Sequence, residues 1–265
     1  VQALPLVESG AAAGLSSEQL ALACASHNAA AIHTDRVGAW IEGMGLSDDD
    51  FRCGAQMPGD REARHAMIRA GESPCQVHNN CSGKHAGFLT LNRHLQGGAE
   101  YLEIDHPVQV AVKAAFEEVT GEDSPGYAID GCSAPNHATT LTGLARAMAA
   151  FATAKGRSGV RAEAMQRLIA AMTAHPELVA GEGRACTALM RAMDGRVAVK
   201  TGAEGVFVAI LPEQGLGVAL QPESLPGVGV GRTVLRCPFQ PLREPDPQER
   251  HGGAETEISA RTLQR

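Results

Sequence analysis

The order of the hydrophobic patterns constrains this chain more than any other feature of its sequence. Helical spacing of apolar residues dominates up to about residue 172, whereas strand-like patterns come almost entirely after residue 196. Ser16 and Gln19 form a capping-box pattern at the start of the first helix. Asp60 can cap a later helix that ends at Gly71, and Pro107 suits the first position of another. Helices are therefore expected over 16–24, 32–44, 60–71, 84–95, 107–119, 141–151 and 160–172.

Strands are predicted over 197–199, 206–211 and 217–220, with residues 127–129 as a short fourth candidate. The last two of the three are separated by Pro212-Glu213-Gln214-Gly215, which is typical of a hairpin turn. The pattern as a whole predicts a helix-rich α+β protein with its sheet late in the chain. Because three strands are few for so many helices, we expect either that further strands precede Val1 or that the sheet is small.

The composition argues against several classes of partner. A formal net charge of −7 gives no electrostatic basis for binding nucleic acid or an anionic membrane. The longest apolar stretches are far shorter than the roughly 18 to 20 residues that cross a bilayer, and the first residues lack the pattern of a signal peptide. The seven cysteines are scattered, odd in number and without a C-x-x-C pair, which is unlike a disulfide framework. A cytoplasmic location is therefore expected.

Two short motifs carry hydroxyl and amine groups of the kind that hydrolases use. Lys200-Thr201-Gly202 lies between two predicted strands, and a K-T-G triplet on a strand is one mark of penicillin-recognising serine hydrolases. Ser26-His27-Asn28 follows a capped helix and has the S-x-N form. Each motif alone also fits an ordinary structural role: a solvated lysine at a strand end, a serine bonded to local backbone, or a packed histidine.

The densest polar cluster is the segment 79–85, placed where a helix begins. The free N–H groups at a helix start favour an anion, which is either the Cys81 thiolate or a substrate carboxylate. The alternative is an N-cap in which Ser82 caps the helix and Lys84 faces solvent. Cys132, in a tight turn over 130–135, can meet Cys81 at a metal ion. Two thiolates alone make a poor zinc site by spacing, so structural burial of both also stays open.

A charged segment over 175–184 separates two predicted elements. It contains His175-Pro176-Glu177 and Gly181-Glu182-Gly183-Arg184. Loops of this kind often line clefts, although solvated charge explains any single member equally well. We therefore expect a flexible loop that is a candidate wall of the site.

In combination and in this order, these segments resemble one family, the rhizobial-type L-asparaginases of the asparaginase II family. The resemblance implies a serine β-lactamase/glutaminase-like fold, which is α+β with an antiparallel sheet and a helical subdomain, and some of its strands are expected to be missing here. It also implies hydrolysis of L-asparagine to L-aspartate and ammonia by a serine–lysine mechanism, and a homodimer is expected. The matching stretches are 1–6, 24–27, 79–85, 130–132, 175–184 and 200–205.

The resemblance also implies roles for individual residues. Ser26 matches the second catalytic serine and Lys200 the strand lysine. Cys81, Lys84 and Cys132 match a trio that holds zinc near the substrate, a set that includes a lysine and that spacing rules alone would not suggest. Substrate binding is expected of His27, Asn80, Glu182 and Arg184.

Two departures from the family pattern affect what this chain can do. The family's primary serine and its lysine form S-x-x-K, and this tetrad occurs nowhere in the 265 residues. Val1 begins the stretch that follows the tetrad in the family, so we expect the nucleophile upstream of Val1 and little or no turnover from these residues alone. The second departure follows residue 220, where a proline-rich run replaces the family pattern. Residues 1–220 are thus predicted to be the catalytic domain, without its S-x-x-K segment, and 221–265 a divergent tail that is mobile past about residue 240.

Two alternative functions stay open at this point. A non-catalytic, metal-binding remnant of such an enzyme would bind zinc without releasing ammonia, and an unpaired sheet edge would make it prone to self-association. A penicillin-recognising hydrolase or esterase would share the K-T-G and S-x-N motifs, but it does not account for the segment 81–84.

Overall fold

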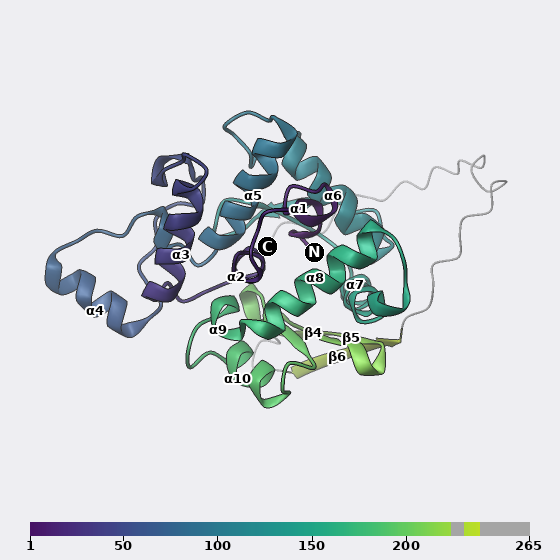
Figure 1. Ribbon diagram of the computed structural model, residues 1–265. Helices are drawn as coiled ribbons and strands as arrows, with labels where there is room; N and C mark the ends of the chain where they lie inside the picture. The colour runs from purple at the N-terminus through teal and green to yellow at the C-terminus, as the bar shows by residue number, and fades with distance from the viewer. Residues whose placement is uncertain (224–230, 239–265) are drawn as a thin grey trace, which may run out of the picture.

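The computed structural model of the chain describes residues 1–223 and 231–238, and most of its helices lie on one side of a four-stranded antiparallel sheet (Figure 1). The α+β class predicted from the sequence is confirmed. None of the helices in this described part is long and apolar enough to cross a membrane. The helices are α1 (Leu4–Glu8), α2 (Ser17–Ala23), α3 (Ala31–Glu42), α4 (Arg61–Ala70), α5 (Ser82–Leu95), α6 (Pro107–Thr120), α7 (Leu141–Ala152), α8 (Val160–Ala174), α9 (Pro176–Val179) and α10 (Ala185–Ala192). The strands are β1 (Tyr127–Ile129), β2 (Pro135–His137), β3 (Ala198–Thr201), β4 (Phe207–Leu211), β5 (Leu216–Glu223) and β6 (Gly231–Pro238).

The helix boundaries follow the capping residues of the sequence. At α2 the Ser16 hydroxyl accepts the Gln19 N–H and the Gln19 side chain accepts the Ser16 N–H, so the capping box forms. At α4 the Asp60 carboxylate caps the first turn, and Gly71 ends the helix in the left-handed conformation. At the end of α5, Gln96 takes the left-handed position, with φ of 54°.

The main sheet has the order β3-β4-β5-β6, with every neighbouring pair antiparallel. The three predicted strands and the turn between the last two are confirmed, and 127–129 pairs with β2 in a separate hairpin. Strand β6 was not predicted, because the prolines in and around this segment favoured irregular structure. The predicted mobility past about residue 240 falls outside the described residues.

Helix α7 packs directly on the sheet and contacts β4, β5 and β6. The close approach needs Gly217 on β5, because a Cβ there would lie 2.1 Å from the backbone nitrogen of Ala149 on α7. Helix α8 contacts α7, α1 and α2 and so joins α7 to the rest of the helical layer (Figure 1). The site described below lies between this helical layer and β3.

The segment 175–184 was predicted to be a flexible loop, and the structure corrects this in part. Its first half is the short helix α9, with Pro176 at the first position and with Leu178 and Val179 buried. Four residues are too few to show a helical period, so this turn could not be predicted from the pattern of apolar residues.

Candidate active site

Ser26 lies just beyond the end of α2, where two backbone hydrogen bonds from other parts of the chain hold the extended segment. The Ser26 N–H donates to the Val179 carbonyl at 3.0 Å, and the His27 N–H donates to the Asn80 carbonyl at 2.9 Å. The three segments 24–27, 79–85 and 175–184, far apart in sequence, therefore meet at this serine. Its side chain stays partly exposed towards a cavity.

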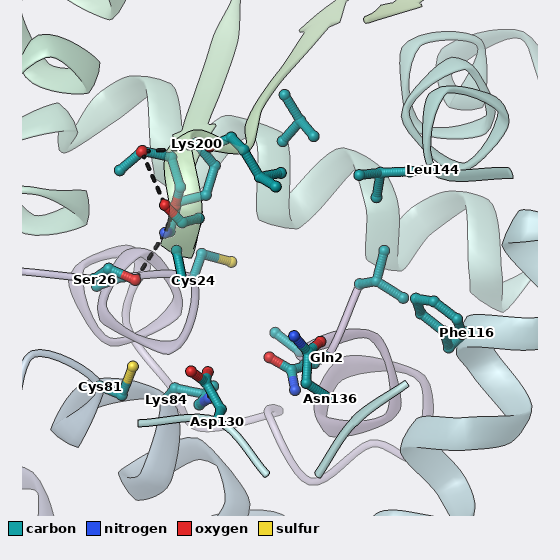
Figure 2. A pocket seen from close by; sticks show the side chains of 18 of the residues that line it. Gln2, Cys24, Ser26, Cys81, Lys84, Phe116, Asp130, Asn136, Leu144 and Lys200 are labelled. Atoms are coloured by element: carbon teal, nitrogen blue, oxygen red, sulfur yellow. Dashed lines mark hydrogen bonds and ion pairs between the residues drawn. The ribbon is translucent and has the colours of Figure 1, made fainter. Parts of the chain in front are cut away.

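Lys200 extends from β3 to the Ser26 side chain (Figure 2). Its Nζ donates to Ser26 Oγ at 2.8 Å and also to the carbonyl of Thr201. Burial lowers the pKa of Lys200, although nearby thiols oppose this shift. A lysine with a lowered pKa exchanges its proton more readily near neutral pH, which suits proton transfer with the hydroxyl.

His27 does not face the cavity. Its ring is buried and stacks on His33, with ring centres 4.7 Å apart. Nδ1 accepts the Ala29 N–H at 3.2 Å, so Nε2 carries the proton and donates to Ser82 Oγ at 3.0 Å. Burial holds the pKa of His27 well below its usual value. The geometry gives His27 a role in holding the backbone around Ser26 in place, and brings it into no contact with the cavity.

The second group of polar side chains is a thiol cluster made of Cys81, Asp130 and Cys132. One ligand atom from each lies within 4.8 Å of the others. Cys81 precedes α5, whereas the other two come from the turn between β1 and β2. The Lys84 amine donates to Cys132 Sγ at 3.1 Å and lies 3.9 Å from Asp130 Oδ2. The sequence analysis placed Asp130 in this turn but did not single it out as a candidate ligand.

The protonation of the cluster is divided unequally between its thiols. The neighbouring Cys81 thiol lowers the pKa of Cys132, and His85 and Lys84 act in the same direction. The same thiol contact and burial raise the pKa of Cys81. Burial alone would lower the pKa of Lys84, but the two thiols and the carboxylate together raise it. These shifts favour the thiolate form of Cys132 and the ammonium form of Lys84.

The start of α5 corrects the N-cap interpretation of the segment 79–85. Cys81, not Ser82, occupies the N-cap position and makes no capping hydrogen bond with its side chain. Ser82 is fully buried and donates to the Val77 carbonyl at 2.8 Å, and Lys84 is only 7% exposed. Gly83 allows α5 to begin this close to α2, because a Cβ there would lie 2.5 Å from the Leu22 carbonyl oxygen of α2.

Both groups line one cavity of about 1000 Å³. Figure 2 shows Ser26 and Lys200 on one side of it and Cys81, Lys84 and Asp130 on another. This is a volume typical of small-molecule sites, and it is far larger than one asparagine molecule. The predicted residues that line it are Ser26, Asn80, Cys81, Lys84, Cys132, Arg184 and Lys200.

Two residues at the edge of the site differ from the sequence-based picture. Glu182 is exposed and absent from the cavity wall, and its carboxylate accepts two hydrogen bonds from Arg191, at 2.7 and 2.8 Å. Gln56 lines the cavity and accepts the Asn80 N–H at 3.0 Å. It was missed because the loop that carries it has no motif, and only the folded chain brings it beside Asn80.

The fold and this site together define the class of protein. An α+β chain that bonds a serine hydroxyl to a half-buried lysine, on a cavity also lined by a thiol-rich cluster, has the features of a hydrolase. The sequence profile of the L-asparaginase II family matches residues 1–224, and the chain belongs to this family of amidohydrolases. The family resemblance found from the motifs is therefore confirmed. No curated protein matches the sequence at a significant level.

Proposed function

We propose that this cavity binds L-asparagine and that Ser26 and Lys200 take part in hydrolysing its side-chain amide to L-aspartate and ammonia. The observation that carries the proposal is the 2.8 Å hydrogen bond from Lys200 Nζ to Ser26 Oγ at the cavity wall. Family membership supports the amide as the substrate bond. The order of elements and the K-T-G strand support a serine β-lactamase/glutaminase-like fold, which we propose on the same grounds.

In the proposed mechanism Ser26 and Lys200 transfer protons. Ser26 passes its hydroxyl proton to the departing ammonia and regains a proton from the Lys200 ammonium group, which donates to Ser26 Oγ; burial favours the neutral amine that this transfer leaves behind. Attack on the amide carbon is assigned to the serine of an S-x-x-K tetrad. Since the 265 residues contain no such tetrad, we propose that they turn over L-asparagine slowly by themselves.

The thiol cluster fits a zinc ion. Thiolates and carboxylates are zinc ligands, and the ligand atoms of Cys81, Asp130 and Cys132 are close enough together to share one ion. We propose that Cys81, Lys84 and Cys132 hold zinc, Lys84 as the neutral amine after it loses a proton, with Asp130 as a further ligand or an acceptor beside the ion. Zinc bound there would supply a Lewis acid that polarises the amide carbonyl.

Substrate contacts are proposed for Asn80 and Arg184, which both line the cavity. The Arg184 guanidinium suits the α-carboxylate of asparagine, because it can donate two parallel hydrogen bonds to it. His27 and Glu182 do not reach the wall, so we propose an indirect role for both: His27 supports the Ser26 segment, and Glu182 fixes the loop through Arg191. A homodimer and a cytoplasmic location remain predictions.

The experiment measures L-asparagine binding by calorimetry and ammonia release in parallel. Both are measured on the 265-residue chain and on the product of the longest reading frame that contains it. We expect Ser26→Ala and Lys200→Met to lower kcat/KM in the active form at least about 100-fold. The controls Ser73→Ala and Lys155→Met change the same residue types at exposed positions outside the cavity. Full activity in Ser26→Ala, or no asparagine binding by any form, would overturn the proposal.

A further inference from the structure

The two cysteines of the thiol cluster lie close enough to form a bond with each other. Cys81 stands at the start of α5 and Cys132 in the turn between β1 and β2, and both are free thiols. Their sulfur atoms lie within 4.8 Å of each other. Because the sulfurs of a disulfide are about 2.05 Å apart, closing the bond needs a movement of less than about 3 Å. A change of one side-chain rotamer moves a cysteine sulfur by a similar distance.

The turn that carries Cys132 is placed where it can adjust. Strands β1 and β2 pair with each other in a sheet of their own, and all three residues of β1 are exposed. Cys81, by contrast, precedes a helix whose first turn is packed tightly against α2 at Gly83. The turn over 130–135 can therefore move towards Cys81 without disturbing the main sheet.

Both sulfurs are reached from the cavity and little from elsewhere. The two cysteines line the cavity, and Figure 2 shows the Cys81 side chain at its wall, although Cys81 is only 7% and Cys132 only 2% exposed. Such limited access favours a small oxidant over a bulky one. The Lys84 amine lies 3.1 Å from Cys132 Sγ, and a cationic neighbour of this kind is typical of cysteines that oxidise readily.

We propose that Cys81 and Cys132 are a site of reversible oxidation, at which a small hydroperoxide such as hydrogen peroxide joins the two sulfurs in a disulfide and thereby removes the zinc site. First, the sulfur of Cys132 attacks one peroxide oxygen and the O–O bond breaks, which leaves a sulfenic acid and one water. The sulfur of Cys81 then attacks that of Cys132 and expels the sulfenic oxygen as a second water. Two thiols are oxidised to the disulfide, and the peroxide is reduced to two waters.

Oxidation and metal binding exclude each other at this pair. The thiolate is the form of cysteine that binds a metal, and a disulfide contains no thiolate. In the oxidised chain only Lys84 and Asp130 of the proposed zinc-binding residues would keep their ligand atoms. This exclusion rests on the zinc site proposed above, whereas the formation of the disulfide does not.

The disulfide is detected by mass spectrometry of the zinc-free 265-residue chain after treatment with hydrogen peroxide. The chain is unfolded, its remaining thiols are capped with N-ethylmaleimide, and it is digested with a protease. We expect one peptide pair joined through Cys81 and Cys132, with loss of the cap at both and its return after reduction with dithiothreitol. Cys75 is a half-buried thiol outside the cluster, and it should keep its cap.

Single substitutions separate the pair from its members. Cys81→Ser should prevent the cross-link and leave Cys132 as a sulfenic acid, which dimedone labels. Cys75→Ser is the matched control and should leave the cross-link unchanged. Thermal unfolding of each variant identifies any that fail to fold, and the peptide map of the unsubstituted chain needs no variant at all.

The exclusion is measured by repeating the oxidation with zinc present. At 100 times its Kd, zinc leaves about one chain in 100 without the ion, so disulfide formation should slow about 100-fold. The oxidised chain should bind no zinc at this site until it is reduced. Oxidation at an equal rate in the chain with zinc bound would overturn the exclusion.

Three results would overturn the disulfide itself. They are a cap retained at both cysteines after peroxide treatment, a bond from either one to a different thiol, and a sulfinic acid at Cys132 in place of the disulfide. None of these measurements uses ammonia release, and the peptide map of the zinc-free chain needs no metal. Failure of the proposed asparagine hydrolysis, or of the proposed zinc site, is therefore distinguishable from failure of this inference.

Discussion

Lys200 Nζ and Ser26 Oγ form a 2.8 Å hydrogen bond across 174 positions of sequence. The bond depends on three separate supports. Val179 holds the Ser26 backbone, Asn80 holds that of His27, and pairing with β4 fixes the register of Lys200 opposite Val208. A hydroxyl and an amine brought together in this way by distant segments mark a site that the fold is built to position.

The neutral form of Lys200 should be populated at lower pH than that of an ordinary lysine. Burial disfavours its ammonium form, so its pKa lies below the usual value of about 10.4. Labelling with a small amine-reactive acylating reagent, measured by mass spectrometry across pH, follows the neutral fraction because only the neutral amine reacts. We expect labelling of Lys200 to rise at a lower pH than labelling of a lysine in a short unstructured peptide treated in the same way. Labelling of Lys200 only at a higher pH than the peptide lysine would contradict this.

Gly83→Ala should destabilise the chain. The new methyl group would lie 2.5 Å from the backbone oxygen of Leu22, and two packed helices would have to separate. We expect a loss of about 1 to 3 kcal/mol in the free energy of unfolding, measured by denaturant titration. Gly98→Ala is the matched control, because a Cβ at Gly98 meets no atom within 4 Å. Equal stability of the two variants would show that α2 and α5 are not tightly packed.

Local signals account for most of what the sequence predicted correctly. The caps Ser16 and Asp60 act within one helical turn, so their helices could be placed from neighbouring residues alone. The strand pattern around the turn at 212–215 is equally local. Helix α9 and strand β6 were missed because one is a single turn and the other depends on pairing with β5.

The candidate site was harder to predict, because its membership depends on convergence in space. Family resemblance supplied the positions of Ser26 and Lys200, which the fold brings into contact. The resemblance could not show that the His27 side chain points away from the cavity and bonds to Ser82. Adjacent side chains in an extended segment point in different directions, and only the fold decides which of them faces the cavity. Nor could the resemblance show that Asp130 joins the two thiols, because one turn of the β1–β2 hairpin decides this.

Acid should destabilise the chain through the stacked pair His27 and His33. Burial lowers the pKa of each ring in the folded state, so below about pH 6.5 the unfolded chain binds more protons than the folded one. Stability is therefore full above that pH and falls as pH decreases towards the folded-state pKa values. Melting temperatures from pH 8 to 5 should show the fall, and His33→Asn should make it shallower. His94→Asn, at an exposed position, is the control and should reproduce the wild-type slope.

Zinc should stabilise the folded chain, and Cys132 should be required for the effect. A ligand that binds only the folded state adds about 2.7 kcal/mol to the free energy of unfolding at 100 times its Kd. The thiol of Cys81, whose pKa is raised, must lose its proton when a metal binds, so the stabilisation should weaken as pH falls. The measurement is the shift in melting temperature on adding zinc, at pH 8 and at pH 6. Cys132→Ser should abolish the shift, whereas Cys75→Ser, which changes a half-buried thiol outside the cluster, should keep it. An equal shift in both variants would mean that zinc binds elsewhere, and the thiol cluster would then be a buried network of hydrogen bonds without a metal.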